Sequence, residues 1–309
     1  DLFGVELNVT DRFPTELIGS SGFENSYNTL FLQSSLMERY IGAAQSILEL
    51  ALPAEPSSAI HWRTRGIIYI ETPGAYVGED KAAEAVLANF MGRAYRRPTE
   101  SMEVKQAVAQ FTQARAEGLS YESAIKQVLQ TVLISPKFLL RVEVGRDGKE
   151  SFPVSDFELA SRLSYFLWAT MPDQELFDLA KEGKLSDQTV LRNQVFRMLE
   201  DQKANTLGDV FAAQWLGFHN VGTRIWLDPI DNPWCTASLM TAMRDETSMF
   251  FMSLLRGDSP IRNLIDSDYT FVNEELATTL YGIEGISGDH MRRIPVDDPN
   301  RGGILGHAS

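Results

Sequence analysis

The residues of this 309-residue chain that could bind a metal or act in catalysis are few and scattered. Four histidines, His61, His219, His290 and His307, lie far apart, and none has a second histidine three or four positions later. The HExxH arrangement of zinc proteases is therefore absent, and so are the G-x-S-x-G, Walker and G-x-G-x-x-G motifs. The residue pattern identifies no catalytic residue and no metal site, and it leaves open whether the chain is an enzyme.

Cys235 is the only cysteine. A single cysteine excludes an intrachain disulfide, a CxxC redox pair, a four-cysteine zinc site and a covalent CxxCH haem site within this chain. Cys235 follows Trp234 just before a predicted helix. A reactive thiol at a helix start and a buried, unreactive thiol both fit this position.

An acidic segment, Asp266–Thr270 followed by Asn273, places oxygen atoms at alternating positions, as calcium-binding loops do. The glycine and the distal glutamate of an EF-hand are missing. Helix capping by Asn273 and turn formation by the aspartates explain the same residues without a metal. We therefore predict capping and assign no metal ligand.

Large apolar side chains within amphipathic helical patterns are candidates for the core. Trp168, Trp215 and Trp226 could form a flat platform for sugars, but the first two fall within such patterns. We predict one buried group that consists of Leu163, Phe166, Trp168, Trp215, Leu216 and Phe250.

Two charged residues interrupt apolar helical patterns. Arg162 lies on a predicted helix whose opposite side is apolar, and Glu246 stands where a leucine would fit the apolar face of a long helix. An arginine–carboxylate pair in a partly buried seam would explain both residues. Two separate, solvated charges are the alternative.

The composition indicates a folded, acidic protein. The chain has 28 Lys and Arg against 42 Asp and Glu, a net charge of −14, and 44% of its residues are hydrophobic. Such a charge repels a phosphate backbone and an anionic membrane surface, so we expect no nucleic-acid partner. No stretch approaches the ~20 apolar residues of a membrane span, so we expect none.

The fold is predicted to be mainly α, with two to three packed helical subdomains and at most one short strand pair. The only strand-like run is Ile67–Ile70, within a proline-rich break at 53–79. Capping residues and apolar spacing predict helices over residues 30–52, 80–95, 99–118, 120–136, 204–218, 236–256 and 273–282, and three more that begin near 155, 172 and 186. Ser120 is expected to cap one of them, and Ser155 with Glu158 forms an S-x-x-E capping box at the start of another.

Six stretches together resemble planctomycete-type domains of unknown function, found in exported proteins fused to c-type cytochrome modules. They are RAYRRP (93–98), LISPKFLLR (133–141), ELASRLSYFLWATMPD (158–173), AQWL (213–216), DYTFVNE (268–274) and RGGILGHAS (301–309).

The order of the stretches also resembles that family, and it implies a domain organisation. Both ends of the chain are expected to be cuts inside a larger protein. The implied parts are an N-terminal helical module at 1–52, a linker or variable insertion at 53–79, a small helical module at 80–145, the main helical module at 153–282, and the start of a cytochrome-associated module at 290–309.

The resemblance implies a periplasmic or otherwise extracytoplasmic protein linked to redox chemistry. Haem c would be attached in the parent protein outside this segment, with no cofactor inside it, and the partners would be haem-bearing domains of the same chain or of a partner subunit. The leading hypothesis is a helical scaffold portion of a c-type cytochrome-linked oxidoreductase or electron-transfer protein. The alternatives are a non-catalytic polymer- or carbohydrate-binding protein and a hydrolase with a carboxylate pair.

His307 is the one residue that the resemblance links to a cofactor. It ends the run Arg301-Gly-Gly-Ile-Leu-Gly-His, whose glycines let the backbone approach a planar group. Because the family's haem site lies downstream of this point, His307 is a candidate for haem proximity, as an axial ligand or as an interface residue. An ordinary loop residue is the third reading.

Overall fold

The computed structural model of the chain describes residues 2–5, 23, 34–141, 143, 152–228, 230–296, 298 and 301–309. The chain divides into two compact units. The first unit comprises Asp1–Glu16, Leu30–Tyr165 and Thr170–Arg192, and the second comprises Leu17–Thr29, Phe166–Ala169 and Asn193–Ser309.

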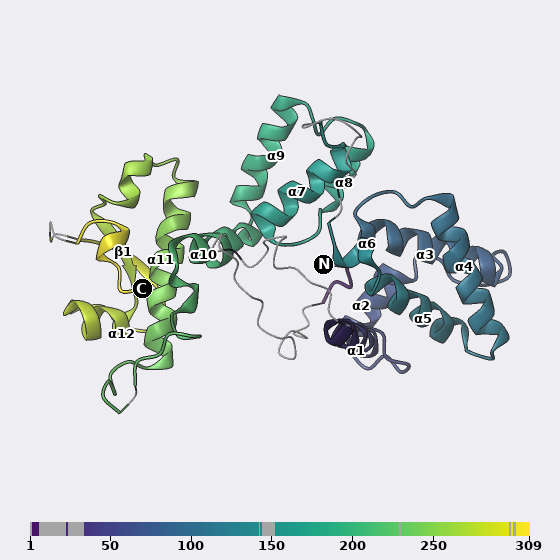
Figure 1. Ribbon diagram of the computed structural model, residues 1–309, viewed down its shortest axis with the longest axis horizontal. Helices are drawn as coiled ribbons and strands as arrows, with labels where there is room; N and C mark the ends of the chain where they lie inside the picture. The colour runs from purple at the N-terminus through teal and green to yellow at the C-terminus, as the bar shows by residue number, and fades with distance from the viewer. Residues whose placement is uncertain are drawn as a thin grey trace. The chain divides into compact units, whose positions relative to one another are not determined.

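The described part of the chain is mainly α-helical, with one pair of short strands, which confirms the predicted fold class. The helices of Figure 1 are α1 (Ser34–Ala51), α2 (Ala59–Ile68), α3 (Glu79–Tyr95), α4 (Ser101–Ala116), α5 (Tyr121–Leu133), α6 (Pro136–Leu139), α7 (Asp156–Trp168), α8 (Gln174–Lys181), α9 (Gln188–Glu200), α10 (Ala213–Leu216), α11 (Ala237–Arg256) and α12 (Glu274–Leu276). The strands are β1 (Tyr269–Val272) and β2 (Arg292–Pro295), and two π-helical turns span Leu207–Ala212 and Ala277–Tyr281.

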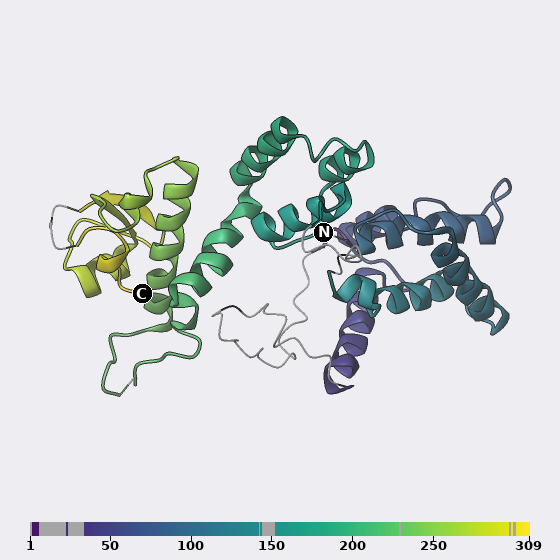
Figure 2. The same cartoon turned by 45° about the horizontal axis from the view of Figure 1, so that its top comes forward.

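The core of the first unit lies where α3, α4 and α5 pack together (Figures 1 and 2). Phe90, Phe111 and Leu129, one from each helix, are almost fully buried there. Local capping fixes where these helices begin: the Ser120 hydroxyl accepts a hydrogen bond from the Ser123 amide at 3.2 Å. The helix predicted from Ser120 is therefore confirmed, whereas the start of the helix predicted at 30–52 lies outside the described residues.

The strand-like run Ile67–Ile70 is not a strand, so that prediction is wrong. Ile67 and Ile68 form the last turn of α2, which Ser58 caps, and Ile68 is 1% exposed against the core. Burial of an isoleucine in a helix outweighs its β propensity, which is a weak preference. The strands instead pair antiparallel in the second unit, from Tyr269 opposite Pro295 to Val272 opposite Arg292.

Helix α11 is the central element of the second unit. Strand β1 and α12 pack against it, and so does the first π-helical turn. Gly208 permits this last contact, because a Cβ atom there would lie 2.4 Å from the Ser248 Oγ. Thr236 caps α11 by accepting from the Leu239 amide at 3.0 Å, at the start that its sequence predicts.

The predicted buried group of six large residues is wrong in part. Trp168 and Phe250 are buried, but Phe166 is 59% exposed and Trp215 is 50% exposed. Residues two positions apart on a helix do not share a face, so Phe166 and Trp168 cannot both point inward. Phe166 and Trp215 instead pack against Phe211 at the surface, with ring centroids 5.8 Å and 6.0 Å from that ring.

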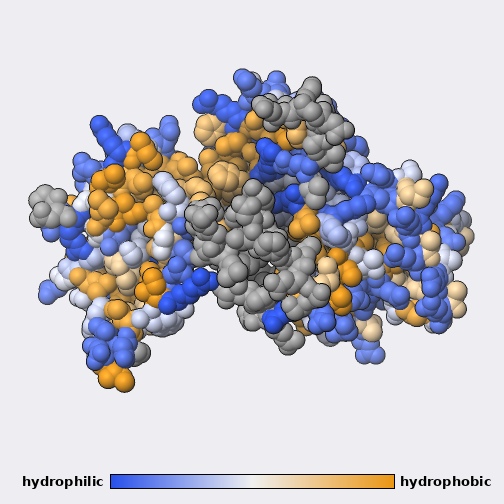
Figure 3. Space-filling model, in the orientation of Figure 1, coloured by the Kyte–Doolittle hydropathy of each residue, from blue (hydrophilic) through white to orange (hydrophobic). Residues whose placement is uncertain are grey.

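None of the described helices combines the length and the apolar character needed to cross a bilayer. The loop that leads into α11 has a hydrophobic tip beside hydrophilic residues (Figure 3). It carries Ile230, which is 88% exposed, together with the exposed Trp226 and Trp234.

Candidate functional site

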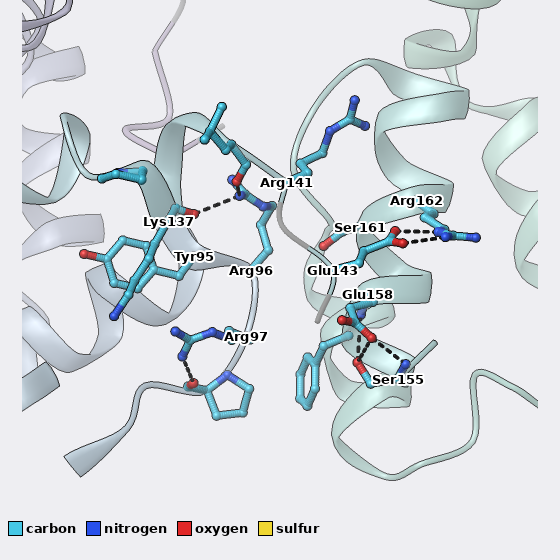
Figure 4. A pocket seen from close by; sticks show the side chains of 14 residues that line it. Tyr95, Arg96, Arg97, Lys137, Arg141, Glu143, Ser155, Glu158, Ser161 and Arg162 are labelled. Carbon is cyan, nitrogen blue, oxygen red and sulfur yellow. Dashed lines mark hydrogen bonds and ion pairs between the residues drawn. The ribbon is translucent and has the colours of Figure 1, made fainter. Parts of the chain in front are cut away.

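The first unit contains a cleft of about 810 Å³ (Figure 4). One wall is the turn Tyr95–Pro98 between α3 and α4, and a second is α6 with Leu140 and Arg141 behind it. The N-terminal half of α7 forms the third wall. We refer to this space as the basic cleft, because Arg96, Arg97, Lys137, Arg141 and Arg162 line it beside two carboxylates, Glu143 and Glu158.

Arg96 builds the floor of the basic cleft. Its backbone is left-handed, with φ at 59°, which ends α3 and turns the side chain under α6. Its two terminal nitrogens donate to four carbonyl oxygens at 2.9 to 3.1 Å, three of which belong to Lys137, Phe138 and Leu140. These carbonyls lie at the end of a short helix and have no helical partners. They satisfy the guanidinium but leave its charge uncompensated.

Glu103 compensates two other cations of the basic cleft. It accepts from both terminal nitrogens of Arg97, at 3.0 and 2.7 Å, and from the Lys137 ammonium. It also accepts from the Glu100 amide at 2.8 Å, which completes a capping box at the start of α4. The hydrogen bond from Arg97, followed by that from Lys137, lowers the pKa of Glu103 to about 2 against the opposing effect of burial.

We expect Glu103→Gln to lower the stability of the first unit by about 2 kcal/mol at pH 7. The lowered pKa of Glu103 corresponds to a somewhat larger free energy, but solvent around its exposed cationic partners screens part of the attraction. A carboxylate whose pKa is lowered by folding stabilises the folded state above its ordinary pKa of 4.5, and this stabilisation is lost as the pH falls toward 2. Urea unfolding followed by circular dichroism should thus show a difference that shrinks between pH 5 and pH 2. The exposed Glu84→Gln is the control, and an equal loss at pH 7 and pH 3 would contradict the pairing.

Arg162 pairs with Glu143, not with Glu246, so the predicted pair is wrong. Its Nε donates to Glu143 Oε1 and its Nη2 to Oε2, both at 2.5 Å, in the two-pronged geometry visible in Figure 4. The hydrogen bond from Arg162 lowers the pKa of Glu143, and the charges of Arg162 and Arg141 lower it further. Glu158 meanwhile bonds Ser155 in the capping box that the sequence predicts.

Arg141 has no carboxylate partner among the described residues. Its guanidinium lies 4.6 Å from the ring centre of Tyr165, and that of Arg96 lies 5.6 Å from the same ring. Two arginines without carboxylate partners therefore flank one aromatic ring in a chain of net charge −14. Arginine does not release its proton, so this arrangement suits the binding of anions and not acid–base catalysis.

A second polar cluster surrounds Glu246 in the second unit. Glu246 is fully buried on α11 and accepts from three donors. The Thr270 hydroxyl lies 2.5 Å from Oε1, the Tyr281 hydroxyl lies 2.8 Å from Oε1 and 2.6 Å from Oε2, and the Ala308 amide lies 3.2 Å from Oε2. Glu246 thus accepts hydrogen bonds from neutral donors, where the sequence analysis predicts an arginine.

Burial is the main cause of the raised pKa of Glu246, and the hydrogen bonds from Thr270, Tyr281 and Ala308 oppose it. Arg301 lies over the Tyr281 ring, 3.7 Å from its centre, and its charge lowers the pKa of Glu246. Burial also raises the pKa of Tyr281, so its hydroxyl remains a donor to Glu246. We refer to these residues as the Glu246 cluster.

His307 lies beside the Glu246 cluster. Its Nδ1 hydrogen-bonds Thr247 Oγ1 at 3.0 Å, and its ring packs edge-on against Phe250 with centroids 4.7 Å apart. Its Nε2 is buried and has no hydrogen-bond partner within the described residues. An iron would need that covered atom, so the residues do not fit haem ligation in this conformation, and haem proximity stays a prediction.

The other candidate residues do not converge on either cluster. Asn273 caps α12 by accepting from the Leu276 amide at 2.9 Å, which confirms the capping prediction. Cys235 is partly exposed, and Trp226 is exposed with its Nε1 donating to the Thr223 carbonyl. Within the part of the chain that the structure describes, no group of three metal-binding side chains is found.

The carboxylate pair of the hydrolase hypothesis has one neighbouring candidate. Burial raises the pKa of Asp245 on α11, and the charge of Asp209 raises it further. Asp209 lies on the first π-helical turn, where it accepts from the Ser248 hydroxyl at 2.5 Å. Asp209 lines the nearby cavity, but Asp245 does not.

The basic cleft is the feature that residue chemistry missed, although a signal for it was present. Three of the six stretches that carry the resemblance, at 93–98, 133–141 and 158–173, supply its walls. Two others, at 268–274 and 301–309, supply Thr270, Arg301 and Ala308 of the Glu246 cluster. The stretches that look family-specific thus gather at two places in the fold.

Three family models match the chain in sequence order. PSD3, protein of unknown function (DUF1587), matches residues 1–53; PSD5 (DUF1595) matches 82–143; and PSD4 (DUF1592) matches 154–283. No curated protein and no solved structure matches the chain. The fusion to cytochrome modules and the export stay predictions. Three successive parts of the chain thus match, in this order, the models of the families DUF1587, DUF1595 and DUF1592.

Proposed function

We propose that this chain is the helical scaffold portion of an extracytoplasmic, c-type cytochrome-linked redox protein. In this role it holds a haem-bearing domain, of the same polypeptide or of a partner subunit, and the haem is attached outside the chain. The observation that carries the proposal is the anchoring of residues 301–309, the stretch that resembles the start of a cytochrome-associated module.

The anchoring uses polar and apolar contacts to α11. The Ala308 amide donates to Glu246, and Thr247 Oγ1 lies 2.6 Å from Ser309 Oγ. Gly303, with φ at 59°, lets the segment pass close to Ile265, since a Cβ atom there would lie 2.5 Å from the Ile265 backbone. A segment held by buried hydrogen bonds and close packing keeps a fixed position, and a scaffold needs this property to orient a second domain.

The charge of the chain favours a partner with a basic docking surface. A net charge of −14 attracts such a surface over distances of about a Debye length, which is ~10 Å at 0.1 M salt. Complementary charge raises association rates more than affinity. This suits contacts through which electrons pass between separately folded domains.

Absorption spectroscopy tests the proposal. The 309-residue chain alone is expected to be colourless, and the complete gene product, made in a host that matures c-type cytochromes, is expected to show a c-type absorption band. In that product, Glu246→Ala should shift the haem reduction potential or slow electron transfer by loosening residues 301–309. A complete product without covalent haem would refute the proposal.

A non-catalytic polymer-binding protein is the second candidate function. The exposed aromatic side chains favour it, above all Trp62 and Tyr76 in the 53–79 region, at 61% and 100% exposure. Aromatic faces of this kind stack on sugar rings. Binding of the chain to insoluble glycans, lost in Trp62→Ala, would favour this function over the scaffold.

A further inference from the structure

We propose that the basic cleft of the first unit binds a small organic carboxylate with an apolar body, and that Arg141 is its principal anion-binding residue. This site goes beyond the scaffold function and does not depend on it. A cleft of about 810 Å³ falls within the range of about 300 to 1,000 Å³ that small-molecule sites occupy.

The positive charge of the basic cleft is only partly neutralised by carboxylates of the protein. Glu103 compensates Arg97 and Lys137, and Glu143 compensates Arg162. Glu158 is engaged with Ser155. The five cations of the cleft against the three carboxylates Glu103, Glu143 and Glu158 leave a net charge of two positive units, and Arg96 and Arg141 are the two cations without a carboxylate partner among the described residues.

The two remaining arginines have different roles. Arg96 has both terminal nitrogens bonded to carbonyl oxygens and is 5% exposed, so it contributes a fixed positive charge. Arg141 is exposed, and its guanidinium lies 4.6 Å from the centre of the Tyr165 ring. Its N–H groups are free to bind a ligand, and the ring holds the guanidinium in place.

The cleft already holds the chemical group that we assign to its ligand. Both carboxylate oxygens of Glu143 accept hydrogen bonds from the Arg162 guanidinium, in the planar, two-pronged geometry that arginine forms with carboxylates. Arg141 acts on the same carboxylate, since its charge lowers the pKa of Glu143. The positive charge of Arg141 would attract a ligand carboxylate in the same way, and Glu143 would compete with the ligand for the arginines.

The apolar walls determine the rest of the ligand. Tyr95, Pro98, Pro136, Leu140 and Phe157 face the same space as the cations. Ligand sites of this kind are mostly apolar and carry a few polar groups that orient the ligand. A compact inorganic anion would leave these surfaces unused, whereas an aromatic or aliphatic acid would cover them.

Calorimetric titration of the full 309-residue chain with 4-phenylbutyrate tests the proposal. Binding is expected at low ionic strength and should weaken as salt is raised. Arg141→Ala should weaken it about tenfold, as the loss of a charge-assisted hydrogen bond does. Lys105→Ala is the matched control, because it removes one positive charge at an exposed position of α4 outside the cleft. It should leave the affinity unchanged.

A variant with the opposite effect separates binding from a structural role. Glu143→Gln removes the internal competitor and frees Arg162, so the affinity for 4-phenylbutyrate should rise several-fold. Equal binding of the uncharged 4-phenylbutan-1-ol, or an unchanged affinity in Arg141→Ala, would overturn the proposal. Inorganic phosphate that binds as tightly as 4-phenylbutyrate would also overturn it, because the apolar walls would then have no role.

Discussion

Replacement of Glu246 by alanine is expected to destabilise the second unit by about 3 to 5 kcal/mol, because it leaves three neutral hydrogen-bond donors without their acceptor in a buried site. The variant leaves the Thr270 hydroxyl, the Tyr281 hydroxyl and the Ala308 amide without their acceptor. An unsatisfied buried donor costs about 1 to 3 kcal/mol, and the values add incompletely because the groups share one site.

Tryptophan fluorescence measures this effect selectively. Of the five tryptophans, Trp62 belongs to the first unit and the other four to the second. A Trp62→Phe background therefore makes the urea transition report on the second unit alone, and Trp62 is exposed enough for this change to be mild. Glu284→Ala, an exposed change of the same type in the same unit, should shift the transition by no more than about 0.5 kcal/mol.

Hydrogen exchange distinguishes loss of the anchor from general destabilisation. In Glu246→Ala the Ala308 amide should lose its protection before the interior of α11 does, since its acceptor has been removed. If Ala308 keeps its protection, or if the stability falls by less than 1 kcal/mol, the Glu246 cluster does not hold residues 301–309.

The sequence predicts those features whose cause is local. The caps at Ser120 and Asn273 each involve an amide three residues away, so residue type and spacing identify them. The capping box of Ser155 and Glu158 is confirmed for the same reason. The mainly α fold follows from such signals added along the chain.

Features that depend on distant residues could not be predicted. The anomaly at Glu246 is visible in the sequence, but its partners Thr270, Tyr281 and Ala308 lie 24, 35 and 62 residues away. A charged residue at an apolar position does not reveal whether a cation or neutral donors will satisfy it. The expected arginine was therefore the wrong partner.

The basic cleft escaped prediction for a related reason. Arg96 contacts carbonyl oxygens more than 40 residues away, and backbone carbonyls carry no sequence signature. Arg141 is recognisable as a binding residue only when the cations around it are seen to be engaged. In the sequence, five basic residues in a chain with more acidic than basic residues read as ordinary surface charge.

His307 is expected to make the second unit acid-sensitive. Burial, with a smaller effect of the Arg301 charge, lowers the pKa of His307 to about 4 from an ordinary value of 6.5. A histidine whose pKa is lowered by folding stabilises fully above pH 6.5, and that stability is lost as the pH falls toward 4. At 1.36 kcal/mol per pKa unit, the loss amounts to about 3 kcal/mol.

Glu246 acts in the opposite direction over part of the same range. Its pKa is raised by folding, so its contribution is present below pH 4.5 and decreases as the pH rises toward the folded-state value. Single-residue variants therefore distinguish the contributions of His307 and Glu246 to the pH dependence of stability. His307→Gln should flatten the decline of stability between pH 6.5 and pH 4, whereas Glu246→Gln should steepen it.

The measurement is the urea midpoint of the second unit in the Trp62→Phe background at pH 7, 5.5 and 4, combined with NMR titration of the imidazole. His307 should titrate near pH 4, because protonation would place a charge against Phe250 and within the field of Arg301. His290→Gln, at an exposed position of the same unit, should leave the pH profile unchanged. Titration of His307 near pH 6.5 would mean that its ring is solvated, and that residues 301–309 are not packed on α11 in solution.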